Sequence, residues 1–428
     1  MTIINSIRAC LLVLSAALAV TLSNTAMAGF SVSGTQLIDA NGNAFVMRGI
    51  NHPHTWYTSE TASFGDIAAT GANTVRVVLS NGGQWTRNSG SDVANVISLC
   101  KENKLICVLE VHDSTGYPES SGAVPLEESA AYWTSPDILQ VIQGEEDYII
   151  INIANEPFGN SGVNSDTYVN GTIEAIQSLR LAGLTHTLMV DAANWGQDWQ
   201  FFMRDNAPQI FAADSQSNTI FSVHMYEVFS SASNQESYIQ AFQSHGLPLI
   251  IGEFGASHGG QDIDIDSLLD LAQQHGIGYI GWSWSGNGDC CLALDLVSNF
   301  DSSDLTPWGQ RLINGSNGIT ETSLIATIFD SSGGNPPTND EMCTWSDGSI
   351  WPICKVDIGD WGYEAGQSCI SRSICPNAGS IGTGNRKIDR FLKQQDREWR
   401  RFLKRQKGEY RRFKKRQNRK LNRVLDKL

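Results

Sequence analysis

The chain has 428 residues, of which 41% are hydrophobic and 18% are charged, and its formal net charge is −15. This length is sufficient for a catalytic domain with a full hydrophobic core and for smaller modules beside it. Residues 29–385 hold ten Lys plus Arg against forty Asp plus Glu, whereas residues 386–428 hold nineteen against five, and the strongly acidic body argues against nucleic acid as a partner.

The first 28 residues are predicted to be a secretory signal peptide. Arg8 precedes an apolar stretch at residues 9–22, and Ala26-Met27-Ala28 has the small-x-small pattern of a cleavage site. The apolar stretch is too short to span a bilayer, and no other stretch reaches eighteen consecutive apolar residues. We therefore expect the mature chain to be secreted.

Eight short apolar runs rich in β-branched residues follow, most of them separated by stretches long enough for a helix. This alternation predicts parallel β-α-β units, and eight such units suit a closed α/β fold, a (β/α)8 TIM barrel, over residues 29–330. The rival is an open doubly wound sheet, but the Gly-rich phosphate loop of that fold is missing after the first run. The predicted strands are residues 45–50, 74–79, 106–111, 148–153, 187–190, 220–223, 247–251 and 279–284.

Polar and aromatic residues recur where these runs end, and that edge of a parallel barrel is where chemistry occurs. Two of them are glutamates, Glu156 before Pro157 and Glu253 before Phe254. Paired carboxyl groups facing each other across a sugar can hydrolyse a glycosidic bond, because one donates a proton while the other attacks or stabilises the anomeric carbon. The other members of the set are Arg76, His112, Asn155, His224, Tyr226 and Trp282.

No metal and no cofactor are expected. The histidines are scattered, and no nearby carboxylates join them with the spacing of a metal site. Ser257 lies outside a Gly-x-Ser-x-Gly motif, so little favours a serine esterase. We therefore expect metal-independent catalysis by carboxyl groups.

Together these motifs resemble glycoside hydrolase family 5 and, more narrowly, the bacterial endo-β-1,4-mannanases of its subfamily 8. The resemblance implies a retaining double displacement with Glu156 as acid/base and Glu253 as nucleophile. It also implies that Arg76 and Tyr226 lower the pKa of Glu253, whereas Glu156 needs a raised pKa to hold its proton. Besides the strand-end set, the matching segments are residues 48–56, 109–116, 190–197 and 281–287.

The resemblance also implies roles for the neighbouring residues. Asn155 and His224 would bind the sugar or orient the carboxylates, and His112 would line the subsite where the sugar ring distorts. Trp282 would be the stacking floor, with Trp284 as the alternative. Trp195 lies in one of the matching segments and is therefore a candidate for a further sugar-binding subsite. Further candidates, each with a core role as the alternative, are Trp56, Trp85 and Trp199.

The function implied is that of a secreted endo-β-1,4-mannanase that hydrolyses internal bonds of mannan, galactomannan or glucomannan. An endo-β-1,4-glucanase is the runner-up, because the sequence does not show whether the innermost subsite prefers an axial or an equatorial 2-hydroxyl. A barrel that only binds polysaccharide is a further alternative, and the presence of both Glu156 and Glu253 favours the enzyme.

A small second module is predicted at residues 343–375, after a linker at residues 331–342 that is rich in Gly, Pro and Ser. The module resembles family 10 carbohydrate-binding modules, which present aromatic rings to crystalline cellulose. Trp345, Trp361 and Tyr363 match aromatic positions of that pattern, while Ser346 replaces a usual aromatic residue.

The cysteines favour disulfides in an exported protein, since eight remain after the signal peptide is removed. Four lie in the small module and allow three pairings. Cys100 and Cys107 could be bridged, and Cys290 and Cys291 could form a vicinal disulfide or remain buried thiols. The module's cysteines are Cys343, Cys354, Cys369 and Cys375.

A basic amphipathic helix is predicted at residues 386–428, after a second linker at residues 376–385. Apolar residues recur every eleven positions, and eleven residues in three turns keep an apolar stripe in line along a helix. We expect this helix either to self-associate or to bind an anionic surface, such as lipid, lipopolysaccharide or the acidic body. One series of the repeat is Ile388, Trp399, Tyr410 and Leu421.

Overall fold

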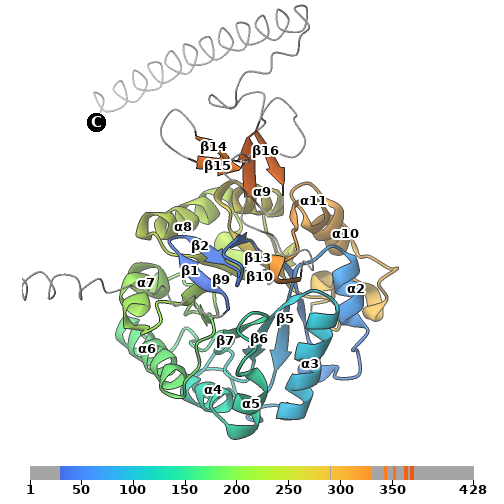
Figure 1. Ribbon diagram of the computed structural model, residues 1–428. Helices are drawn as coiled ribbons and strands as arrows, with labels where there is room; N and C mark the ends of the chain where they lie inside the picture. Colours follow the sequence, from blue (N-terminus) through green and yellow to red (C-terminus); the bar gives the residue numbers. More distant parts are fainter. Residues whose placement is uncertain are drawn as a thin grey trace, which may run out of the picture. The chain divides into compact units, whose positions relative to one another are not determined.

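The computed structural model describes residues 29–289 and 291–329, together with the backbone of four short strands between residues 342 and 370 (Figure 1). The chain divides into two units, Met1–Gly333 and Gly334–Leu428. The predicted signal peptide, Trp345, the side chains of Trp361 and Tyr363, and the predicted carboxy-terminal helix lie outside the described residues.

Eight parallel strands close into a barrel, so the predicted fold class is confirmed. Around the barrel the strands follow the order β10-β13-β4-β5-β6-β7-β8-β9. Each strand from β4 to β9 pairs with the next one in the chain, and β13 closes the ring between β10 and β4. The strands are β4 (Arg48–His52), β5 (Thr74–Leu79), β6 (Ile106–Val111), β7 (Ile149–Asn152), β8 (Leu188–Asp191), β9 (Thr219–Met225), β10 (Leu249–Phe254) and β13 (Gly278–Gly281).

Two predicted strands extend three residues beyond the barrel strand at one end. The first apolar run is divided between two sheets, because Phe45 pairs with Leu37 in a separate antiparallel sheet and the barrel strand begins at Arg48. The last strand ends at Gly281, so Trp282 and Trp284 lie in the segment that follows it. Apolar character alone does not reveal where a chain passes from one sheet to another.

Helices follow the strands and surround the barrel in Figure 1. Several begin with a capping side chain, since Ser89 and Asn164 each accept a hydrogen bond from the backbone N–H three residues later. Two helices end at a glycine in the left-handed conformation, Gly246 and Gly276. The helices are α2 (Ser63–Ala69), α3 (Gly90–Glu102), α4 (Leu126–Trp133), α5 (Pro136–Ile142), α6 (Ser165–Leu181), α7 (Phe202–Ala213), α8 (Ala232–His245), α9 (Ile265–His275), α10 (Pro307–Asn314) and α11 (Ile319–Thr322).

An amino-terminal sheet of three antiparallel strands packs against the apolar end of the barrel interior. Phe30, Leu37 and Phe45 from this region join inward-facing barrel residues in one buried cluster. A larger cluster fills the space between the strands and the helices. The sheet consists of β1 (Ser31–Ser33), β2 (Gln36–Ile38) and β3 (Ala44–Phe45), and the inward barrel residues are Ile106, Val108, Ile150, Met189, Ile220, Ile250 and Ile280.

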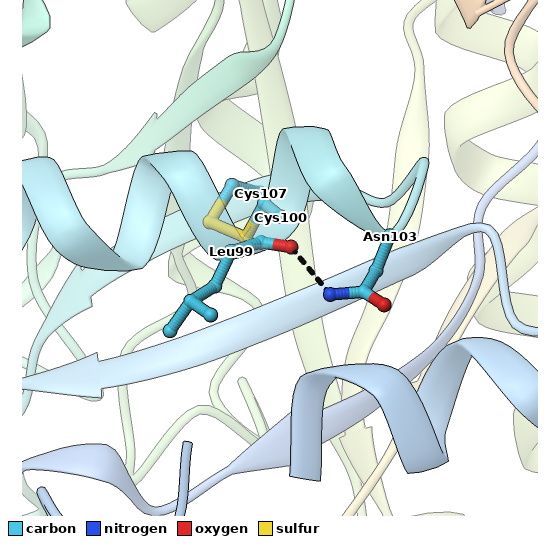
Figure 2. Close-up of a disulfide and its surroundings, with 4 residues drawn as sticks. All are labelled: Leu99, Cys100, Asn103 and Cys107. Atoms are coloured by element: carbon cyan, nitrogen blue, oxygen red, sulfur yellow. Dashed lines mark hydrogen bonds between the residues drawn. A yellow bond between two sulfur atoms is a disulfide. The ribbon is translucent and has the colours of Figure 1, made fainter. Parts of the chain in front are cut away.

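One predicted disulfide is present, between Cys100 at the end of α3 and Cys107 in β6 (Figure 2). It closes a loop of seven residues' separation, for which loop-closure entropy predicts a contribution of about 2 kcal/mol. The side chain of Asn103 donates to the carbonyl of Leu99 and holds the end of the helix inside this loop. Cys291 is also disulfide-bonded, while Cys290 lies outside the described residues.

The carboxy-terminal unit contains two antiparallel strand pairs in its described backbone, β14 with β15 and β16 with β17. Among the described residues, no helix is both long and apolar enough to cross a membrane. The four strands are β14 (Met342–Thr344), β15 (Ile350–Pro352), β16 (Trp361–Glu364) and β17 (Gln367–Ile370).

Candidate active site

The inward-facing side chains change from apolar to polar along several strands of the barrel. Ile106 and Val108 lie in the inner apolar cluster, and Glu110 is the next inward position of the same strand, because side chains in a strand alternate between faces. The same change occurs from Met189 to Asp191 in β8. Polar groups therefore gather at the carboxyl ends of the strands, which is the catalytic end of such barrels.

Glu253 lies within β10 and is 4% exposed. The pairing of β10 with β9 shifts register between Ile251 and Glu253, an irregularity that re-aims a side chain. Arg76 donates to one carboxylate oxygen of Glu253 at 2.8 Å, and the hydroxyl of Tyr226 donates to the other at 3.0 Å. Both predicted partners of Glu253 are therefore in contact with it.

Glu156 follows β7 and is 8% exposed, with a positive φ of 42°. Its backbone N–H donates to Asp191 at 3.1 Å, and its carbonyl accepts from the N–H of Gly116 at 2.9 Å. These backbone contacts fix the segment that carries the carboxyl group. An oxygen of Glu156 lies within 4.8 Å of an oxygen of Glu253.

Burial raises the pKa of the Glu253 carboxyl, while the positive charges of His224 and Arg76 act in the opposite direction. The expected lowering of this pKa by Arg76 is present, but the desolvation of the buried carboxylate outweighs it and the pKa is raised overall. His224 and Arg76 nevertheless keep the pKa of Glu253 lower than burial alone would make it.

His224 lies between the two glutamates. Its Nδ1 atom is 2.7 Å from Glu156 Oε1 and 3.5 Å from Glu253 Oε2, and its Nε2 atom is 3.2 Å from Asp191 Oδ2. Burial acts to lower the pKa of His224, but the negative charges of Glu253 and Asp191 raise it to about 10. The imidazole is therefore a cation at neutral pH.

Glu156, His224 and Glu253 also form the one group among the described residues whose ligand atoms are close enough for a metal ion. A protonated imidazole has no free lone pair for a metal, so the charge of His224 disfavours that use. Metal-independent catalysis stays a prediction.

Arg76 contacts several polar side chains of the site at once. Its guanidinium is fully buried and donates to Asn152 at 2.8 Å and to Asn155 at 2.7 Å, besides Glu253. It also lies 3.8 Å from Glu110 and 3.4 Å from Asp191. Burial acts to lower the pKa of Arg76, but these carboxylates raise it overall. Arg76 thus lies within 4 Å of three buried carboxylates, two of which also lie close to His224.

His112 and Trp282 lie together at one side of the site, with ring centroids 5.6 Å apart and planes 23° apart. Glu110 lies 2.8 Å from His112 Nδ1 and fixes the ring from behind. Trp282 lines the cleft, whereas Trp284 is fully buried, so the structure favours Trp282 as the stacking floor.

A cleft of about 500 Å³ opens above the two glutamates. Arg76 and His224 are fully buried and lie outside its lining. Trp56 and Trp85 contact the ring of His112, and Trp199 lines the cleft. The predicted site residues that line the cleft are Glu156, Glu253, His112, Asn155, Tyr226, Trp282 and Trp195.

Sequence reasoning missed several functional neighbours. Glu110 and Asp191 are buried carboxylates that hold His112, Arg76 and His224. The signal was available, because Glu110 precedes His112 by two positions and therefore shares its face of the strand. Glu227 and His258 also line the cleft, and no strand-end rule points to them because they lie in a 3₁₀ helix and a short hairpin.

Comparison with known proteins gives a consistent set of relatives. A family model described as "Cellulase (glycosyl hydrolase family 5)" matches residues 38–288. The chain is 49% identical over 364 residues to a mannan endo-1,4-β-mannosidase of Cellvibrio japonicus, covering 84% of this chain and 83% of the relative. It is 48% identical over 354 residues to the enzyme of that name from Streptomyces lividans, covering 82% and 90%.

Among solved structures, a β-mannanase from Thermomonospora fusca is 54% identical, with a TM-score of 0.69, and the match covers 70% of this chain and 99% of that one. A second structure of the same enzyme, described as a mannohexaose complex, matches with a TM-score of 0.68 over the same shares.

Proposed function

The chain belongs to glycosyl hydrolase family 5, and from that membership we propose that it is an endo-β-1,4-mannanase that hydrolyses internal bonds of mannan, galactomannan or glucomannan. The observation that carries the chemistry is the placement of Glu156 and Glu253, which have oxygens within 4.8 Å of each other in one cleft. This proximity supports a retaining mechanism, in which the carboxyl groups are about 5 to 5.5 Å apart, over an inverting one.

In the first step Glu253 attacks the anomeric carbon and forms a glycosyl ester, while Glu156 gives its proton to the leaving oxygen and the glycosidic bond breaks. In the second step a water molecule attacks the same carbon and passes a proton to Glu156, and Glu253 leaves as a carboxylate. The two displacements together retain the anomeric configuration.

The surrounding charges support these roles. As Glu156 loses its proton, the cationic His224 at 2.7 Å stabilises the negative charge that forms. Arg76 and Tyr226 donate to the Glu253 carboxylate and keep it oriented for attack. Tyr226 retains its proton because burial raises its pKa. Two glutamates in one cleft thereby take different parts in the reaction.

The relatives support mannan over cellulose as the substrate, because those about half identical over most of the chain carry the mannosidase name. A relative with the double name β-mannanase/endoglucanase A is 49% identical over 265 residues, so glucan hydrolysis is the alternative to test. The cellulase-type structural neighbour at 18% identity supports the fold alone.

A reducing-sugar assay on galactomannan, glucomannan and carboxymethyl cellulose tests the substrate class. We expect high activity on the two mannans, with kcat/KM about 5- to 150-fold lower on carboxymethyl cellulose, since a hydroxyl that points away from its hydrogen-bond partner costs about 1 to 3 kcal/mol. Equal or greater activity on carboxymethyl cellulose would support the endoglucanase instead. Inactivity on all three would support a barrel that only binds polysaccharide.

The sequence supports secretion and attachment as further parts of this function. The predicted signal peptide at residues 1–28 supports export, and the module at residues 343–375 supports retention on cellulose near mannan. Replacing Trp361 and Tyr363 together by alanine is expected to abolish retention on insoluble cellulose while the rate on soluble mannan stays that of the parent chain. Equal loss of both would show that these residues maintain the fold.

The basic segment at residues 386–428 is proposed to bind an anionic surface or to self-associate. Deleting this segment and then measuring vesicle binding and sedimentation would test the two alternatives.

A further inference from the structure

Glu119 is an exposed carboxylate outside the reaction machinery, yet three donors converge on it. It lies in the loop between β6 and α4. One oxygen accepts from the indole N–H of Trp195 and from the backbone N–H of Asn160, and the other accepts from the backbone N–H of Ser161. Donation by Asn160 and Trp195 lowers the pKa of Glu119 to about 2, so the carboxylate is ionised at neutral pH.

These contacts join three consecutive loops of the barrel. Glu119 follows β6, Asn160 follows β7, and Trp195 follows β8. Asn160 also accepts from the indole N–H of Trp199 at 2.8 Å through its side-chain oxygen. Both indoles are therefore anchored, Trp195 directly by Glu119 and Trp199 through the residue that Glu119 holds.

Glycines leave room for this arrangement. Gly116 has a φ of +73°, and a Cβ there would overlap the six-membered ring of Trp195. A Cβ at Gly159 would lie 2.8 Å from a carboxylate oxygen of Glu119. The ring of Trp195 thus packs closely against Gly116, and its hydrogen bond to the Glu119 carboxylate fixes the rotation of the ring.

The two indoles line the cleft together with Asn160. Trp282 and His112, the pair proposed to bind the sugar ring that reacts, line the same cleft. Trp195 is tied to the segment of the proton donor, because its backbone N–H donates to the carbonyl of Phe158, two residues after Glu156. Sugar units that leave with the protonated oxygen would therefore extend toward Trp195.

We infer that Glu119 is a positioning residue that holds Trp195 and, through Asn160, Trp199 as a stacking platform for the sugar units of the leaving group. The inference rests on the proposed function, because such a platform has a role only if the cleft binds a polysaccharide across the two glutamates. An indole free to rotate would lose stacking area and would pay an ordering cost at each binding event.

The experiment compares two substrates with wild type and Glu119→Gln. Mannopentaose presents sugars to the platform, whereas an aryl β-mannobioside has a leaving group without sugars. An amide at position 119 cannot accept from all three donors without placing its own N–H against one of them. The ratio of kcat/KM for mannopentaose to kcat/KM for the aryl substrate is expected to fall about tenfold, mainly through KM. Glu174→Gln, at an exposed carboxylate on α6, is the matched control and should keep the wild-type ratio.

A double-mutant cycle with Trp195→Ala separates positioning from general damage. If Glu119 acts through Trp195, Glu119→Gln should lower this ratio less in the Trp195→Ala background than in the wild type, and the remaining loss is the part that acts through Asn160 and Trp199. Additive losses, or equal losses on both substrates, would overturn the inference. A wild-type protein that hydrolyses neither substrate would instead refute the proposed function, so the two failures are distinct.

Discussion

The variant Glu253→Gln is expected to lose nearly all activity on galactomannan, because an amide cannot form the glycosyl ester on which the proposed double displacement depends. The amide keeps the size of the side chain and can still accept from Arg76 or Tyr226, so the fold should persist. Initial rates of reducing-sugar release measure the loss, and circular dichroism verifies the fold.

The companion variant Glu156→Ala is expected to lose about 10²- to 10⁴-fold on mannan, since only proton transfer is removed. It should recover turnover on aryl mannosides whose leaving group needs no protonation. Equal losses on both substrates would contradict the assignment of Glu156 as acid. Glu174→Gln serves again as the control for removal of a carboxylate from the surface.

A second large effect is expected for Arg76→Met, on stability as well as activity. Its removal leaves Glu110, Asp191 and Glu253 buried without their shared cation, and breaking a buried ion pair in this way costs about 3 to 5 kcal/mol. The pKa of Glu253 would rise further, so the acidic limb of the pH–rate profile should move to higher pH as the carboxylate becomes harder to ionise.

Urea unfolding and the pH dependence of kcat/KM measure the two effects. Arg76→Lys keeps the charge but loses the planar fork, so an intermediate loss is expected. Arg87→Met makes the same chemical change at a partly exposed pair with Asp137 and should cost less than about 1 kcal/mol. An Arg76→Met variant as stable as Arg87→Met would show that the buried carboxylates do not depend on Arg76.

The fold was predictable because the barrel repeats one local pattern eight times. The errors occur where strand pairing depends on residues that are distant in the chain. Phe45 continues an apolar run into Met47 but pairs with Leu37 in the amino-terminal sheet, and no local signal separates the two sheets. Periodicity specifies which face a residue occupies, whereas the choice of pairing partner depends on residues distant in the chain.

The site residues were predictable where they lie at the carboxyl ends of strands. The residues proposed around Glu156 and Glu253 are indeed brought together in one cleft or directly beneath it. The direction of the Glu253 pKa was not predictable from neighbours alone, because burial is a property of the whole fold. Glu119 was equally invisible, since its role depends on two other loops that the sequence does not place beside it.

The inward face of the barrel has a practical consequence for adaptation. Its lower layers are apolar and covered by the amino-terminal sheet, while its upper layer carries the charges, so the apolar layers can be repacked without replacing a residue that lines the cleft. Distant substitutions of this kind combine almost additively. Substitutions that repack Met189 or Ile220 could therefore change thermal stability, and substitutions in the loops could change sugar preference, without one change offsetting the other.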